Sequence, residues 1–186
     1  MEQILHDQKV YELLERVDAD LAARACATGC AHCGGGLHRG DYPRKPRGGP
    51  AWDKRDSFCC DREGCRKRTT PPSVRFLGRK VYVGVVVVLV AAMMQGPSAP
   101  RVARLREALG IDRRTLLRWR AWWTEMFGQS GFWKGARGRF RQPVRVERLP
   151  LALVEVFAAQ QREGLLKLMQ FLSPITTGSC PGVLAM

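Results

Sequence analysis

The chain has 186 residues and 45% of them are hydrophobic, a composition that excludes a fully disordered or a fibrous protein. Its charge is unusual, because 31 Lys and Arg residues outnumber 17 Asp and Glu residues for a net charge of +14. Residues 66–145 hold 18 basic and three acidic residues, so the whole excess lies in this central block. Such a block predicts a polyanionic partner, with nucleic acid favoured over an acidic membrane.

Residues 1–25 predict an N-terminal amphipathic helix. Apolar residues at helical spacing form one stripe along it: Ile4, Leu5, Tyr11, Leu13, Leu14, Val17 and Leu21. The segment has no basic start leading into an apolar core, so we expect no secretory signal and a cytoplasmic protein. The seven cysteines of such a chain are more typical of metal binding than of disulfides.

Residues 26–78 predict a zinc ribbon. They are poor in Val, Ile and Leu but rich in Gly, Pro, Arg and Cys, so a hydrophobic core alone does not explain their folding. Two cysteine groups lie here, a CxxC turn of the zinc-knuckle type and a later Cys-Cys-Asp-Arg-Glu-Gly-Cys segment. Two such groups can supply four thiolates to a tetrahedral, structural Zn²⁺ that stabilises the fold. The predicted ligands are Cys30, Cys33, Cys60 and Cys65.

The sequence leaves other ligand sets open. Cys59 competes with Cys60 for the third position, and Cys26, His32 and His38 are weaker candidates. Free buried thiols and a redox CxxC are the alternatives to a metal site. A thioredoxin-type CxxC opens a helix, whereas three glycines follow Cys33 here, so structural zinc is favoured.

Residues 79–127 predict a buried helix followed by a helix-turn-helix. The apolar run Val81–Met94 spans about 14 residues, short of the ~20 that a membrane-spanning helix needs, so we expect no membrane anchor. Its length favours a helix from about Lys80 to Gln95, and its many valines leave a strand as the alternative.

Two helices are predicted at residues 101–109 and 113–127, with a sharp turn at Gly110 and Asp112 as the N-cap of the second helix. In the second helix, Leu116, Trp119 and Trp123 recur as a buried face. A different face of this helix is expected to enter the major groove of DNA and to contact bases or phosphates. Its candidate contacts are Arg113, Arg114, Thr115, Arg118 and Trp122. The alternative is a helical hairpin whose arginines are only solvated.

Residues 128–148 are rich in Gly and Arg and predict a flexible basic arm. Its candidate DNA contacts are Arg137, Arg139 and Arg141. They alternate with three aromatic residues suited to minor-groove insertion or to stacking on unpaired bases: Phe132, Trp133 and Phe140. A plain linker is nearly as well supported.

Residues 149–186 predict a C-terminal helical segment and a tail. The helical part, residues 149–172, carries two apolar faces with a hinge expected near Gly164, and its charges balance. We expect it to pack on the apolar run Val81–Met94 and so to complete one core. A helical dimer interface is the alternative.

The sequence LREALGIDRRTLLRW resembles the helix-turn-helix of bacterial insertion-sequence transposases and their regulators. The sequence CAHCGG…FCC…GCRKRTTPPSVRFLGRKVY is similar to the zinc-ribbon segment at the front of some of those proteins. Together these stretches cover roughly residues 26–125. The resemblance implies binding to transposon-end DNA, and in full-length transposases a following RNase-H-like domain cuts the DNA.

The sequence departs from that family after Asp112. No further Asp follows, and the remaining acidic residues are Glu125, Glu147, Glu155 and Glu163, whereas a two-metal nuclease needs several carboxylates. We therefore expect a DNA-binding protein without catalysis of its own, acting in transposition or its regulation. Two alternatives are a transposase whose catalytic part is missing or lies on another chain, and a zinc-ribbon module that binds RNA.

The expected fold is mainly α, with a small β zinc ribbon and a three-helix core built on the helix-turn-helix. The expected cofactor is structural Zn²⁺, and the expected partner is double-stranded DNA. A transposase or a second copy of the chain is the protein partner that the resemblance suggests. The expected location is the bacterial cytoplasm, in association with the nucleoid.

Overall fold

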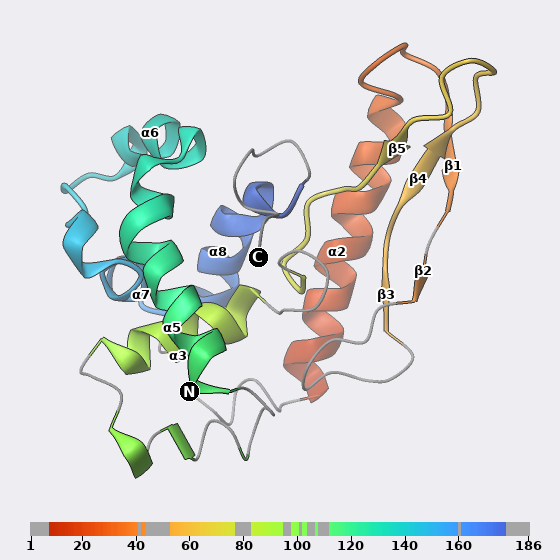
Figure 1. Ribbon diagram of the computed structural model, residues 1–186. Helices are drawn as coiled ribbons and strands as arrows, with labels where there is room; N and C mark the ends of the chain where they lie inside the picture. The colour runs from red at the N-terminus through yellow and green to blue at the C-terminus, as the bar shows by residue number, and fades with distance from the viewer. Residues whose placement is uncertain are drawn as a thin grey trace.

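The computed structural model describes residues 8–40, 42–43, 53–76, 83–94, 98–100, 102–103, 107, 112–159 and 161–177. Most of these residues are helical, and a small antiparallel sheet lies to one side of the helices (Figure 1). This agrees with the predicted mainly α fold with a small β part. The α-helices of the described residues include α2 (Gln8–Thr28), α3 (Val83–Met93), α5 (Arg113–Ala121), α6 (Gly131–Ala136), α7 (Leu151–Val156) and α8 (Arg162–Leu172). The strands are β1 (Leu37–Arg39), β2 (Tyr42–Pro43), β3 (Lys54–Arg55), β4 (Phe58–Cys60) and β5 (Arg68–Thr69).

The strands form two small antiparallel sheets. One sheet has the order β1-β4-β5, and the other pairs β2 with β3. In the first sheet Leu37 lies opposite Cys60, and His38 lies opposite Cys59. Because side chains alternate between the faces of a strand, this register sends the two neighbouring cysteines to opposite faces. We call the described residues 29–40, 42–43 and 53–70 the cysteine module.

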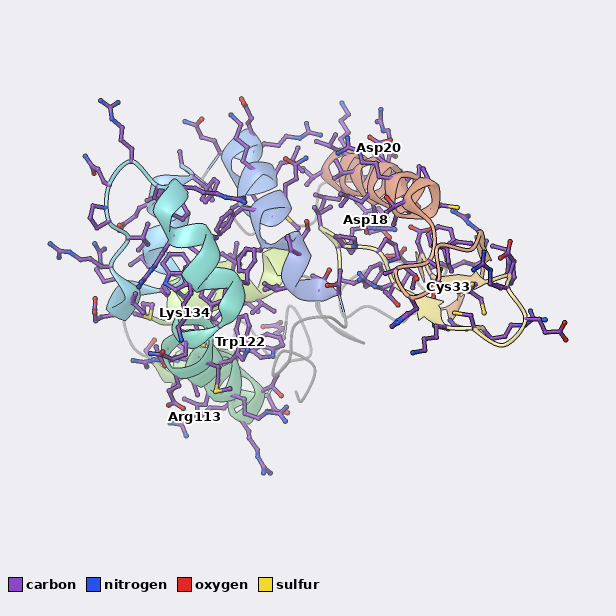
Figure 2. The ribbon with its side chains drawn as sticks, turned by 90° about the horizontal axis from the view of Figure 1, so that it is seen from above. Asp18, Asp20, Cys33, Arg113, Trp122 and Lys134 are labelled. Atoms are coloured by element: carbon purple, nitrogen blue, oxygen red, sulfur yellow. The ribbon has the colours of Figure 1, made fainter. Side chains whose placement is uncertain are left out.

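Helix α2 lies beside the cysteine module (Figure 1), and a buried ionic network joins it to the segment that follows β5. Asp18 and Asp20 point to different sides of α2 (Figure 2), and Asp18 is buried whereas Asp20 is exposed. The guanidinium of Arg75 donates to the carboxylate of Asp18 at 2.9 Å and to that of Asp53 at 2.6 Å. Arg75 is 3% exposed, so this cation of the basic block is satisfied inside the protein and does not contribute to its surface.

Helix α3 is the centre of the helical part. It contacts α5, α7 and α8, and its residues from Val86 to Val90 are all buried. The predicted helix in the Val81–Met94 run is therefore found, and the strand alternative is wrong. The expected packing of the C-terminal segment on this run is also found, because α7 and α8 both contact α3.

The predicted break between two helical segments is found, but it lies a few residues before Gly164. The chain turns between the end of α7 at Val156 and the start of α8 at Arg162, and Gly164 lies inside the first turn of α8. A Cβ atom at Gly164 would collide with the carbonyl oxygens of Phe157 and Ala158. This glycine therefore permits a close approach of two backbones and is not a hinge.

The flexible arm predicted for residues 128–148 is also wrong. This segment forms α6 and three short helical turns, namely 3₁₀ turns at Phe127–Gln129, Arg137–Arg139 and Val146–Arg148. Trp133 is 1% exposed, and its ring lies 5.5 Å from that of Phe127 and 5.9 Å from that of Phe140. Phe132 also packs in this cluster, against Phe127 and Phe171. The aromatic residues that suggested DNA stacking therefore belong to the core.

Several predictions fall outside the described residues. These are the start of the N-terminal helix at residues 1–7, most of the first helix of the helix-turn-helix, its turn at Gly110 and Ile111, and the tail after residue 177. Among the helices that the structure describes, none combines the length and the apolar character needed to cross a bilayer.

Candidate metal centre and basic helical region

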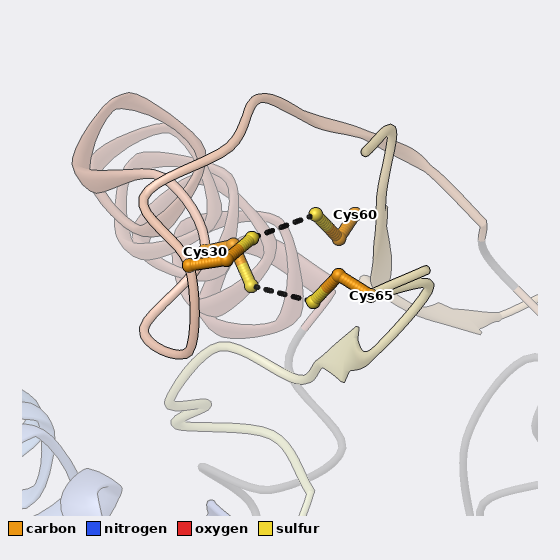
Figure 3. A group of neighbouring side chains, drawn as sticks. Cys30, Cys60 and Cys65 are labelled. Carbon is orange, nitrogen blue, oxygen red and sulfur yellow. Dashed lines mark hydrogen bonds between the residues drawn. The ribbon is translucent and has the colours of Figure 1, made fainter. Parts of the chain in front are cut away.

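Four cysteine side chains meet at one end of the cysteine module (Figure 3). The Sγ atoms of Cys30 and Cys65 lie 3.7 Å apart, and those of Cys33 and Cys60 lie 3.5 Å apart. All four Sγ atoms lie within 4.8 Å of one another. A tetrahedral zinc site with Zn–S bonds of about 2.3 Å separates its sulfurs by about 3.8 Å. The cluster therefore has the donor set and the spacing of a four-thiolate metal centre.

The local backbone aims these sulfurs at one point. Cys30 and Cys33 lie on the turn after α2, where the N–H of Gly34 donates to the carbonyl of Cys30 at 2.8 Å and Gly34 has a φ of +69°. Cys60 ends β4, and Cys65 follows Gly64, whose φ is +84°. Positive φ values favour glycine, so both turns depend on a glycine beside a ligand.

Backbone amides also surround the sulfurs. The N–H groups of His32, Arg62 and Lys67 donate to the sulfurs of Cys30, Cys60 and Cys65, in each case from two residues further along the chain. The N–H of Asp61 donates to the carbonyl of Gly36 at 3.0 Å and ties the two cysteine turns together. Such bonds stabilise thiolates and orient metal ligands.

The cysteine pKa values diverge within the cluster. The N–H of His32, with a smaller effect from the N–H of Cys33, lowers the pKa of Cys30 to about 7 against the effect of burial. Burial raises the pKa of Cys60 to about 12. For Cys65 the N–H of Lys67 lowers the pKa, but the neighbouring thiol of Cys33 and burial leave it above its ordinary value. Crowded sulfurs without a cation disfavour a second negative charge beside the first, whereas a bound divalent cation would favour thiolates.

The structure decides between the alternative ligands in favour of Cys60. Its side chain is 0% exposed and faces the other three cysteines, whereas the Sγ of Cys59 donates to the carbonyl of Arg66 at 3.4 Å. Cys26 donates to the carbonyl of Leu37 at 3.5 Å, and His32 and His38 are exposed. None of these four belongs to the cluster of potential ligands found among the described residues.

The predicted DNA contacts lie in residues 112–148, which we call the basic helical region. Asp112 caps α5, as predicted, because its carboxylate accepts the N–H of Thr115 at 2.7 Å. The buried face of α5 is also the predicted one, with Leu116 at 0% and Trp119 at 5% exposure. The exposed cations of the region are Arg113, Arg114, Arg118, Lys134, Arg137, Arg139, Arg141, Arg145 and Arg148.

Two of the predicted DNA contacts are wrong. Trp122 is 4% exposed and packs against Trp123, with 4.8 Å between the ring centroids, so it cannot reach a DNA base. The helix becomes a π-helix from Trp122 to Met126, and its wider turn lets both tryptophans enter the core. Thr115 is 7% exposed, and its hydroxyl accepts a hydrogen bond from Arg118 at 3.2 Å.

Sequence reasoning missed Leu117 on the outer side of α5. Leu117 is 38% exposed, although its neighbour Leu116 is fully buried. It lies three residues after Arg114 and four after Arg113, the spacing at which helical side chains become neighbours. That spacing is visible in the sequence, but Leu117 was predicted to lie on neither the buried face nor the DNA-binding face of the helix.

The two candidate sites lie far apart in the molecule. Figure 2 shows Arg113 and Lys134 on the helical side and Cys33 at the opposite end. Comparisons with protein-family models, with curated proteins and with solved structures find no match to this chain. The chemistry of these two regions is therefore the basis for a functional assignment.

Proposed function

We propose that the chain is a DNA-binding protein without catalysis of its own, in which α5 and the rest of the basic helical region contact duplex DNA. The four-cysteine cluster holds a structural Zn²⁺ ion in this proposal. The proposed role is in transposition or its regulation at the bacterial nucleoid, and the sequence resemblance to insertion-sequence transposases supports it. A transposase or a second copy of the chain is the proposed protein partner.

One observation carries the DNA-binding part, namely that all but one of the exposed cations of the basic helical region lack an ion pair among the described residues. The ion pairs found among the described residues involve only one of its cations, Arg148, which binds Glu155 at 2.6 Å. The deeply buried Arg75, by contrast, is neutralised by Asp18 and Asp53. Exposed cations that repel one another and lack internal partners favour an external polyanion.

Helix α5 is the element best suited to enter the major groove of DNA. It begins at Arg113 with a side-chain cap, and its inner face is anchored by Leu116 and Trp119. Exposed Arg113 and Arg114 occupy its N-terminal turn, the part of a recognition helix that usually approaches bases. A rigid helix with arginines at this end supports duplex binding over a merely solvated face.

Four thiolate donors within 4.8 Å suit zinc better than a hard cation such as Mg²⁺. All four positions of the tetrahedron are taken by protein ligands, so the ion would supply folding energy and no reactive position. The cysteine module has few buried apolar side chains of its own, Phe58 among them, which fits such a role.

Fluorescence anisotropy with a random-sequence duplex tests the proposal across a series of salt concentrations. If the region meets about six to eight phosphates, log K should fall with log salt at a slope of about −5 to −7. A slope shallower than about −2, or tighter binding to single-stranded RNA of the same length, would contradict duplex binding by this region.

A further inference from the structure

The outer side of α5 carries one apolar side chain among its arginines. Leu117 is one of three large hydrophobic residues that are exposed in the described part of the chain, with Met126 at 52% and Val156 at 54%. Of these three, only Leu117 lies within α5, where Arg113 and Arg114 are its helical neighbours.

The neighbours of Leu117 along the helix leave its side chain prominent. One turn further along, Ala121 follows Leu117 at the helical spacing, and it is small and half-buried. Trp122, the bulky residue that the sequence suggested for this side, points into the core instead. Leu117 is thus the most prominent apolar group on the outer side of α5.

The positive charges beside Leu117 limit the kind of partner that this side chain can contact. An apolar partner helix would have to desolvate Arg113 and Arg114 beside it, which is costly without paired anions. A DNA major groove offers phosphates to the arginines and one apolar group to the leucine, the 5-methyl of thymine. The bases without that methyl group present mainly polar atoms in the groove.

We propose that Leu117 reads the 5-methyl group of a thymine in the major groove, so that the preferred DNA sites contain thymine at the position opposite this residue. The inference rests on the proposed function, because it requires that α5 lie in the groove. It adds a specificity-determining residue and a class of target site, whereas Arg113 and Arg114 could bind phosphates of any sequence.

Removal of the methyl group from the DNA tests the proposal. A random duplex pool is first enriched on the intact protein and is then amplified with either dTTP or dUTP, which gives duplexes that differ by the thymine methyl. Burial of one methyl group on binding predicts about fourfold weaker binding to the dUTP duplexes. The Leu117→Ala variant should bind both kinds of duplex equally well.

Met126→Ala is the matched control, since Met126 is also exposed but lies beyond α5, and it should keep the fourfold preference for thymine. If the intact protein binds duplexes with a steep salt dependence but shows no preference for thymine, the role of Leu117 is overturned and the proposed function stands. A preference that survives in Leu117→Ala also overturns it. If the intact protein binds no duplex, both proposals fail.

Discussion

The guanidinium of Arg55, on β3, donates to the carbonyl oxygen of Thr176 at 3.2 Å and so joins the cysteine module to the last described turn of the chain. The same guanidinium donates to the carbonyls of Pro71 at 2.9 Å and Phe76 at 3.3 Å. Thr176 in turn accepts the N–H of Ser73 with its hydroxyl at 2.9 Å. The cysteine module is therefore fastened to the helical part through buried polar bonds.

Replacement of Arg55 should loosen this junction. Arg55→Ala leaves several buried carbonyls without a donor, and we expect the free energy of unfolding to fall by about 2–4 kcal/mol. Lys54→Ala is the control, because Lys54 is exposed on the same strand and should change stability by less than about 0.5 kcal/mol. Urea unfolding, monitored by tryptophan fluorescence, measures the free energy of unfolding of both variants. Equal free energies of unfolding of the two variants would show that the Arg55 junction does not stabilise the protein.

Adjacent cysteines should behave differently toward metal. Cys60→Ser removes a ligand from the cluster, whereas Cys59→Ser changes a thiol that faces Arg66 and the opposite side of β4. We expect one zinc ion per chain in the Cys59→Ser variant and in the unchanged protein, and substantial loss of zinc in the Cys60→Ser variant. Elemental analysis after purification without chelators measures the content. Full zinc in Cys60→Ser would contradict the ligand assignment.

Metal affinity should rise with pH. The raised pKa values of Cys60 and Cys65 mean that both are thiols at neutral pH in the metal-free protein, so an ion must displace their protons. The lowered pKa of Cys30, about 7, means that this group loses its proton over the neutral range. Titration calorimetry in buffers with different ionisation enthalpies counts the protons released. An affinity that is constant from about pH 6 to pH 8 would contradict metal binding by these thiols.

Much of this architecture was predictable because local patterns were consistent with tertiary packing. The spacing of the cysteines gave Cys30, Cys33 and Cys65 and narrowed the fourth ligand to Cys59 or Cys60, and the length of the Val81–Met94 run identified a helix. The choice between Cys59 and Cys60 could not be made from spacing alone, because it depends on the register of β4 against β1.

The errors share a physical cause, which is that composition does not show where aromatic residues are buried. Gly and Arg around Trp133 suggested a flexible arm, but the aromatic rings from Phe127 to Phe171 supply enough apolar area to fold it. The side on which Trp122 lies was extrapolated from its spacing to Arg114 and Arg118, but Trp122 also follows the buried Thr115 and Trp119 at helical spacing.

The aromatic cluster should therefore be a major source of stability. Trp133→Ala should lower the free energy of unfolding by about 3–5 kcal/mol, since it empties a fully buried ring site next to Phe127 and Phe140. Lys134→Ala, at the exposed neighbour, should cost less than about 0.5 kcal/mol. Thermal unfolding followed by circular dichroism compares the two. Near-identical curves would show that this segment is a loose arm.

The central claim is that α5 meets the DNA backbone, and the salt dependence of duplex binding in two charge-matched variants tests it most directly. One variant carries Arg113→Gln and Arg114→Gln on α5. The other carries Arg16→Gln and Arg24→Gln on the exposed side of α2 and loses the same charge. The account predicts a slope of log K against log salt that is shallower by about 2 for the α5 variant and nearly unchanged for the α2 variant. Equal slopes in the two variants would contradict it.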